Sequence, residues 1–159
     1  MTFRILCVGR VRESFFQGAV GEYEKRLSRY AKVEILECPD EKAPERLSEA
    51  EAMNVKRKEG GRILDRIRDG DYVIALSIGG KRFTSEAFAG HIKDLMVSGR
   101  STVSFVIGGS LGLSPEVIKR ADEEISFSDF TFPHQLMRVI LLEQIYRAEK
   151  ILSGEPYHK

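Results

Sequence analysis

The stretch that decides the fold is Phe105-Val-Ile-Gly-Gly-Ser-Leu-Gly-Leu-Ser-Pro115, together with Ile125-Ser-Phe-Ser-Asp-Phe-Thr-Phe-Pro-His-Gln135 further along the chain. Each stretch starts in a short β-branched and aromatic run, at Val103–Ile107 and Glu124–Phe127, that is typical of a buried strand. Glycines close the first run, and small polar residues close the second. Because ligands of an open α/β sheet bind where loops leave the carboxyl ends of strands, these two loops predict a ligand site.

The glycines of the first loop have two interpretations. Gly108, Gly109 and Gly112 carry no side chain, so the backbone there can take positive φ angles, approach a ligand closely and present bare amides. The same glycines also suit an ordinary turn from a strand into a helix. Taken alone, the glycine positions leave both interpretations open.

A buried helix is predicted after Pro133, which suits a first helical turn because its missing N–H costs nothing there. Residues Leu136–Leu142 are apolar on every side of that helix except at Arg138, so the helix lies either in the middle of the domain or at a subunit interface. A lone arginine in such a place must be paired or must face a ligand, and we favour a structural pair. Gly154 and Pro156 end the helix.

The rest of the chain alternates between strand and helix patterns. Further strands are predicted at Phe3–Val8, Val33–Cys38 and Asp71–Ser77, and further helices at Phe15–Leu27, at Pro44–Glu59 with a break at Gly60-Gly61, at Ser85–Ser98 and at Pro115–Ala121. This order predicts an α/β fold. We expect a single domain over residues 1–159, with a mostly parallel sheet of about five or six strands and helices on both faces.

The composition is that of a globular protein in water, since 42% of the 159 residues are hydrophobic and 31% are charged. The 25 Lys and Arg residues nearly balance the 24 Asp and Glu residues, so the net charge gives no sign of a nucleic-acid partner. An RNA would have to be met by local cationic patches. The densest patch is Lys56-Arg57-Lys58, which predicts either a phosphate contact or a plain exposed helix face.

The cysteines and the hydrophobic runs bear on metal, redox and membrane chemistry. Cys7 and Cys38 lie in apolar runs without further ligands at metal spacing, which predicts two reduced core thiols and no metal site. No run approaches the length of a membrane span, and no signal peptide precedes Phe3. We therefore expect a cytoplasmic protein with no membrane partner.

Two other motifs could suggest phosphate binding or catalysis. The loop Ile78–Arg82 contains Gly-Gly-Lys, as the end of a phosphate-binding loop does, but the first glycine of that motif is missing and Arg82 stands where Ser or Thr must bind magnesium. His91 has no acidic or nucleophilic neighbour in the sequence. The sequence therefore predicts no nucleotide loop here and a packed or partly exposed helix residue at His91.

Four motifs carry a resemblance to a known family: Phe-Val-Ile-Gly-Gly-Ser-Leu-Gly-Leu (105–113), Phe-Pro-His-Gln-Leu-Met-Arg-Val (132–139), Leu-Leu-Glu-Gln-Ile-Tyr-Arg-Ala (141–148) and Pro-Tyr-His-Lys (156–159). They resemble the SPOUT superfamily of trefoil-knotted methyltransferases, and the similarity runs over the whole chain. The resemblance implies an α/β knot with a C-terminal trefoil knot, a homodimer, and S-adenosyl-L-methionine as the cofactor. It also implies methylation of N3 of a pseudouridine in large-subunit (23S) ribosomal RNA, on the assembled ribosome.

The resemblance further implies where the cofactor binds. Backbone groups at three strand ends are expected to hydrogen-bond the adenine, and apolar side chains are expected to line its pocket. The implied residues are Leu76, Gly108, Phe127, Ser128, Asp129, Phe130, Thr131 and Phe132. Asp129 either favours the positive charge of the donor or caps a turn.

Methyl transfer from a sulfonium needs orientation rather than a metal or a covalent intermediate, but the acceptor nitrogen of a pseudouridine must also lose a proton. A histidine near its neutral pKa, or a cation beside the developing base anion, can serve. We assign this role to the vicinity of His158, with Tyr157 and Lys159 contacting the nucleotide, and hold His134 as the second candidate. The tail of one subunit is expected to complete the site of the other.

Two alternatives belong to other functional classes. A dinucleotide-binding oxidoreductase is suggested by the glycines at 108, 109 and 112 and by Asp129 at roughly the expected distance, although the second glycine of the fingerprint is misplaced. The second alternative is a ribosome-associated RNA-binding factor without catalytic activity. Cofactor binding separates these hypotheses, because only the enzymes bind S-adenosylmethionine or NAD.

Overall fold

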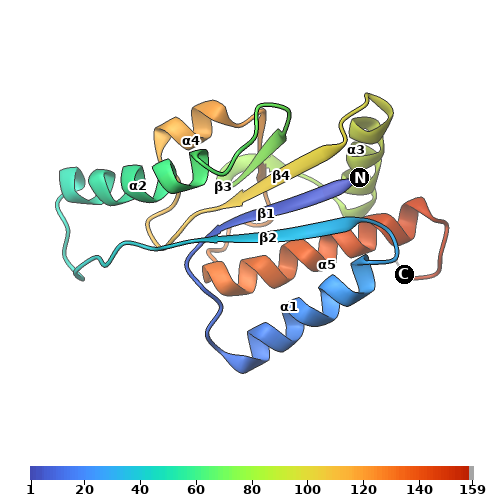
Figure 1. Cartoon of the computed structure of the whole chain (residues 1–159), viewed down its shortest axis with the longest axis horizontal. Helices are drawn as coiled ribbons and strands as arrows, with labels where there is room; N and C mark the ends of the chain where they lie inside the picture. Colours follow the sequence, from blue (N-terminus) through green and yellow to red (C-terminus); the bar gives the residue numbers. More distant parts are fainter. Residues whose placement is uncertain (158–159) are drawn as a thin grey trace.

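The chain forms five strands and five helices in alternation within residues 1–157, the part that this computed structural model describes (Figure 1). The strands are β1 (Thr2–Val8), β2 (Lys32–Cys38), β3 (Tyr72–Arg82), β4 (Thr102–Ile107) and β5 (Glu123–Ser126). The helices are α1 (Ser14–Leu27), α2 (Glu49–Leu64), α3 (Ser85–Val97), α4 (Pro115–Arg120) and α5 (His134–Leu152). The predicted alternation is confirmed.

The strands form one parallel sheet in the order β2-β1-β4-β3-β5. Side chains along β1 alternate between the two faces of the sheet: Phe3 and Ile5 belong to one core cluster, and Leu6 and Val8 to the other. Strands that are apolar on both sides are expected where helices cover both faces of a parallel sheet. The predicted parallel α/β sheet is therefore confirmed.

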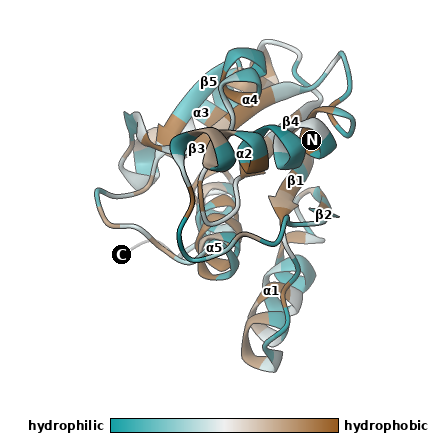
Figure 2. Ribbon diagram, turned by 90° about the vertical axis from the view of Figure 1, so that its left-hand side faces the viewer, coloured by the Kyte–Doolittle hydropathy of each residue, from teal (hydrophilic) through white to brown (hydrophobic). Residues whose placement is uncertain are grey.

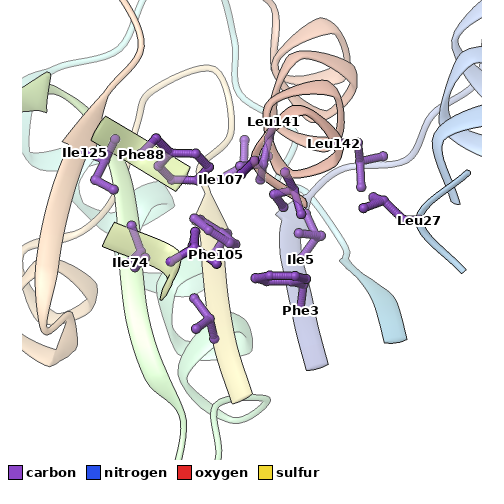
Figure 3. Packing of buried hydrophobic residues seen from close by; sticks show 14 of the residues in the cluster. Phe3, Ile5, Leu27, Ile74, Phe88, Phe105, Ile107, Ile125, Leu141 and Leu142 are labelled. Atoms are coloured by element: carbon purple, nitrogen blue, oxygen red, sulfur yellow. The ribbon is translucent and has the colours of Figure 1, made fainter. Parts of the chain in front are cut away.

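Helices cover both faces of the sheet. α1, α3 and α5 pack on one face, and α2 and α4 pack on the other (Figure 1). In the larger cluster, Phe88 of α3 and Leu141 of α5 meet Ile5 and Phe105 on the sheet (Figure 3). α5 is thus the central helix of its face, with α1 on one side and α3 on the other. The trefoil knot stays a prediction.

The start and the course of α2 differ from the sequence prediction. The helix begins at Glu49 rather than at Pro44, because Ser48 forms a capping box: its hydroxyl accepts from the Glu51 amide at 3.2 Å, and the Glu51 carboxylate accepts from the Ser48 amide at 2.8 Å. The predicted break at Gly60-Gly61 is also wrong, since the helix runs through both glycines to Leu64. Gly60 instead lets the helix lie directly against Ser114, whose side chain occupies the space of a Cβ.

β3 is longer than predicted and includes Gly79 to Arg82, which the sequence placed in a loop. It pairs with β5 twice, first around Leu76 and again, after a bulge, at Lys81 and Arg82. A Cβ on Gly80 would lie 2.6 Å from the backbone of Ile125 in β5. The glycine is therefore required by close contact between two strands and not by a turn.

Cys7 and Cys38 are free and buried, as predicted. Burial raises the pKa of the Cys7 thiol to about 12 and also raises the pKa of Cys38, so both thiols stay protonated at neutral pH. Within residues 1–157, no group of His, Cys, Asp and Glu side chains could hold a metal ion, and no helix is long and apolar enough to cross a bilayer.

Candidate functional site

A cavity of about 1020 Å³ lies at the carboxyl ends of β3, β4 and β5. Figure 2 looks onto this edge of the sheet. The walls come from the bulged part of β3 (Leu76–Gly79), from the loop between β4 and α4 (Gly108–Leu113), and from β5 with the following loop into α5 (Glu124–His134). Three strand exits that are far apart in the sequence therefore meet at one site, which is where a doubly covered parallel sheet binds ligands.

The loop Gly108–Leu113 is a tight turn whose backbone faces the cavity. Gly109 and Gly112 form an isolated antiparallel bridge, with the Gly112 amide donating to the Gly109 carbonyl at 3.1 Å. Gly112 has a φ of 88°, which glycine adopts without strain. A Cβ on Gly108 would lie 2.8 Å from the carbonyl carbon of Gly112. Only glycine at position 108 allows the turn to close this tightly.

Seven of the eight residues assigned to the cofactor line this cavity: Leu76, Gly108, Phe127, Ser128, Phe130, Thr131 and Phe132. The loop after β5 is held by its own serines, since the Ser128 hydroxyl accepts from the Phe130 amide at 3.0 Å and the Ser126 hydroxyl donates to the Ser128 carbonyl at 3.1 Å. Asp129 does not line the cavity. Its exposed carboxylate forms an ion pair with Arg82 of β3.

One carboxylate on the cavity wall was not predicted from the sequence. Glu124 of β5 lines the cavity, and its Oε2 accepts from the Ser77 hydroxyl at 2.6 Å. Ser77 lines the cavity too. Glu124 is the second residue of β5 and Ser77 lies within β3, and no local pattern in the sequence marks either residue. Glu124, rather than Asp129, places negative charge at the wall where a cationic ligand would bind.

His134, at the start of α5, also lines the cavity. Its ring packs on Gly9, where a Cβ would lie 2.9 Å from His134 Cε1. The buried Nδ1 has no hydrogen-bond partner within residues 1–157. Burial, with a smaller contribution from the Arg138 charge, lowers the pKa of His134, so the imidazole is neutral at pH 7 and can accept a proton.

Arg138 forms the structural pair that was expected. Its side chain is 1% exposed, Nη1 donates to Glu37 Oε1 at 2.6 Å, and Nη2 donates to the Gly9 carbonyl at 3.2 Å. The same Glu37 oxygen accepts from the Val11 amide at 3.2 Å. One buried guanidinium thus ties α5 to the ends of β1 and β2.

Replacing Arg138 by alanine is expected to lower the free energy of unfolding by about 3 kcal/mol, because the change leaves Glu37 and the Gly9 carbonyl without their donor. The value lies at the low end for a buried pair, since Glu37 is 36% exposed and can rehydrate. Urea unfolding measures it. Arg26→Ala, which breaks the exposed Arg26–Glu22 pair, should change stability far less. A loss below about 1 kcal/mol for Arg138→Ala would contradict this assignment.

A second buried carboxyl group lies behind the loop after β4. Glu59 of α2 is 5% exposed, and its Oε1 accepts from the Glu41 amide at 3.1 Å. Its Oε2 has no partner within the described chain and touches Gly109, where a Cβ would lie 2.9 Å away. Burial raises the pKa of Glu59. The group supports the cavity loop best in its neutral form.

The Glu59→Gln variant is expected to gain stability relative to the wild type as the pH rises from about 5 to about 8. The raised pKa makes the folded protein hold this proton after the unfolded chain has released it, so the wild-type contribution is lost as the pH rises through the folded pKa. Urea unfolding across this range tests the sign. Glu116→Gln serves as a flat control in this range: the hydrogen bond from its own backbone amide lowers the pKa of Glu116, so its contribution to stability changes only below the ordinary value of 4.5. Parallel pH profiles for the wild type and Glu59→Gln would rule out the proposed role of burial.

Tyr157 packs along α5 of its own chain and does not line the cavity of that chain. Its ring lies 4.9 Å from the Tyr146 ring, the Arg147 guanidinium lies 4.7 Å above it, and its hydroxyl donates to Glu143 at 3.3 Å. His158 and Lys159, the other two residues assigned to catalysis, lie outside the described residues. Their role stays a prediction.

The remaining candidates have structural partners. His91 contacts Glu123 at 2.5 Å and stacks on Phe83 at 5.3 Å, which confirms a packed helix residue. In the basic triplet of α2, Arg57 pairs with Glu116 of α4 at 2.9 Å. The triplet is therefore partly neutralised by the neighbouring helix.

Comparison with known proteins agrees with this geometry. Residues 1–158 match a family model described as "Predicted SPOUT methyltransferase". The chain is 59% identical, over the full length of both chains, to proteins named ribosomal RNA large subunit methyltransferase H from Lactiplantibacillus plantarum and from Bacillus cereus. A solved structure of a probable methylase family protein from Haemophilus influenzae shares the fold, with a TM-score of 0.53 at 14% identity over 99% of this chain and 70% of that one. This chain belongs to the SPOUT methyltransferase family.

Proposed function

We propose that this protein transfers a methyl group from S-adenosylmethionine to N3 of a pseudouridine in large-subunit (23S) ribosomal RNA. The observation that carries the proposal is the cavity at the three strand exits, in a chain 59% identical to proteins named ribosomal RNA large subunit methyltransferase H. Its volume lies at the upper end of the range that small-molecule sites occupy. Family membership favours methyl transfer over the oxidoreductase and the non-catalytic alternatives.

The cavity walls suit a cationic nucleoside. Backbone groups of the loop Gly108–Leu113 other than the Gly112 amide can hydrogen-bond a heterocycle, and Leu76, Ile107 and Phe132 supply apolar walls. The Glu124 carboxylate, held by Ser77, favours a positively charged donor by its charge. When bound, S-adenosylmethionine supplies an electrophilic methyl group.

The chain contributes orientation and a proton acceptor. Holding the acceptor nitrogen in line with the methyl carbon can lower the barrier by about 7 kcal/mol when the groups are well aligned. The proton on N3 passes to a neutral imidazole, for which His134 on the cavity wall and His158 on the tail are the candidates. Tyr157 and Lys159 contact the nucleotide in this proposal.

The proposal includes a homodimer, in which the tail of one subunit completes the site of its partner. Three apolar residues of α5, Leu136, Val139 and Ile140, remain only half-buried in the single chain. A second copy can cover them, as an isologous interface requires. A ribosomal substrate places the protein in the cytoplasm, and the assembled ribosome is the proposed substrate form.

The test is methylation of ribosomes and of free ribosomal RNA from cells that lack this protein, with labelled S-adenosylmethionine and mass mapping of the product. We expect a label on N3 of a pseudouridine of 23S RNA, with ribosomes as the better substrate. In calorimetry, S-adenosylmethionine should bind and NAD should not. Binding of NAD, or RNA binding without turnover, would favour one of the alternatives.

A further inference from the structure

The loop between β1 and α1 is held rigidly beside the cavity. The Gly9 amide donates to the Cys38 carbonyl at 2.8 Å, and the Val11 amide donates to Glu37. The Val11 carbonyl accepts from the Gln17 side chain at 3.0 Å. Both backbone groups of Gly9 and of Val11 therefore have partners, which fixes the course of the loop at these two residues.

This loop is tied to α5 as well. The Gly9 carbonyl accepts from Arg138, and the Arg12 amide donates to the Gln135 side chain at 3.2 Å. The ring of His134, which lines the cavity, packs on Gly9. The side chains next to Gly9 in sequence thus lie beside the wall of the proposed cofactor site.

Two cations project from this fixed loop without a carboxylate partner. Arg10 and Arg12 are exposed, and neither forms an ion pair with any residue of the described chain. Many other arginines of the same chain do, such as Arg4 with Asp71 and Arg62 with Glu41. A guanidinium that is free and preorganised suits bidentate contact with a phosphate.

An aromatic ring follows the two arginines. Phe15, in the first turn of α1, is 67% exposed, and its one ring contact within residues 1–157 is with the tilted ring of its neighbour Phe16, whose centroid lies 4.5 Å away. The first turn of α1 contains no acidic residue, although Glu13 precedes it and Asp40 lies on the neighbouring strand end. RNA with unstacked bases is recognised by such a combination of cations for phosphates and a ring for a base.

We infer that Arg10, Arg12 and Phe15 form a docking surface for the RNA strand that flanks the target nucleotide. Arg10 and Arg12 contact backbone phosphates, and Phe15 stacks on a neighbouring base. The inference rests on the proposed function, and it names the part of the chain that binds the polymer rather than the base. The near-zero net charge of the chain agrees with recognition by this local patch.

The experiment compares the wild type with the double variant Arg10→Ala/Arg12→Ala, using ribosomes and 23S RNA from cells that lack this protein. Filter binding over a range of salt concentrations should show at least tenfold weaker binding by the variant. The slope of log affinity against log salt should fall by roughly 1.4 to 1.8, as two lost phosphate contacts predict. KM for RNA should rise while kcat at saturation and the affinity for S-adenosylmethionine stay within twofold of the wild type, as roughly uniform binding predicts.

Two further variants sharpen the result. Lys25→Ala/Arg29→Ala removes the same charge at the far end of α1, where both residues are exposed, and should change RNA binding less than about twofold. Phe15→Leu should weaken binding by at least about fivefold with an unchanged salt slope, because stacking is not ionic. All these side chains are exposed, so the variants are expected to fold.

The outcomes separate this inference from the proposed function. If the wild type methylates RNA but the Arg10/Arg12 variant keeps its affinity and salt slope, the docking surface is refuted and the proposed function stands. If the variant loses its dimeric mass in sedimentation, or its affinity for S-adenosylmethionine, the loop serves the subunit contact or the cavity and the inference is wrong. If the wild type binds RNA without methylating it, the proposed function fails, and the salt slopes still decide the docking surface.

Discussion

A chain that lacks Tyr157 to Lys159 is expected to lose methylation of ribosomal RNA and to keep its affinity for S-adenosylmethionine. The cavity walls all lie before residue 138, and Tyr157 packs on α5 rather than on those walls. The cofactor site of the shortened chain should therefore stay intact. Labelled methyl transfer to ribosomes measures the first effect, and calorimetry with S-adenosylmethionine measures the second.

The matched control is Tyr157→Phe, which keeps the ring contact with Tyr146 at 4.9 Å and removes only the hydroxyl that donates to Glu143. This variant tests whether the packing of the tail on α5 needs that hydrogen bond, and it should keep the melting temperature of the wild type within about 2 °C. Turnover by the shortened chain at the wild-type rate would remove the tail from the mechanism.

Replacing Gly108 by valine should abolish cofactor binding, with the dissociation constant of S-adenosylmethionine raised at least about 100-fold, or about 2.7 kcal/mol. The first added carbon would lie 2.8 Å from the carbonyl carbon of Gly112 and 3.1 Å from Leu113 Cδ2. The backbone of the turn must move, and the amides that face the cavity move with it. Calorimetry measures the loss of affinity directly.

Gly90→Val is the control for the same chemical change. Gly90 lies in α3, and a Cβ there would meet no heavy atom within 4 Å. We expect unchanged affinity and equal or slightly higher stability, since glycine is a poor helix former. Urea unfolding of Gly108→Val separates a moved loop from an unfolded chain. Wild-type affinity in a folded Gly108→Val protein would remove this loop from the cofactor site.

The two variants together test whether the tail acts on the partner subunit. A mixed dimer of the shortened chain and Gly108→Val combines an intact cavity on one subunit with an intact tail on the other. Random mixing in equal amounts should restore about a quarter of the wild-type sites if the tail acts across the interface. No activity would return if each tail serves its own cavity.

The existence of the five strands and their parallel arrangement were predictable, because buried parallel strands are apolar on both faces and stand out in the sequence. The wrong predictions arose at residues whose type suits two different structural roles. Gly79-Gly80 predicted a loop, yet Gly80 is there because a Cβ at this position would clash with the backbone of Ile125 in β5 at 2.6 Å. Pro44 suggested the start of α2, while the capping box of Ser48 and Glu51, visible in the sequence, was the better signal.

The loops that form the candidate site could be predicted from the sequence, but most side-chain contacts within the site could not. Glycine and small polar residues after apolar runs indicated the strand exits, and the family resemblance supplied the cofactor positions. The partner of Arg138 could not be found from sequence, because Glu37 lies 101 residues away along the chain. The Glu124 side chain was missed because a charged residue at a strand end has no distinguishing local pattern.

The position of β1 has a consequence for synthesis. β1 is made first, but Thr2 pairs with Thr102 and Phe3 with Val103, so β4 must leave the ribosome before β1 is enclosed on both edges. At a synthesis rate of about 5 to 20 residues per second, that interval is roughly 5 to 20 s. During this interval, one edge of β1 stays unpaired and apolar, and chaperones bind such surfaces. Contacts of such long sequence separation also make folding slower than in a helical bundle of the same size.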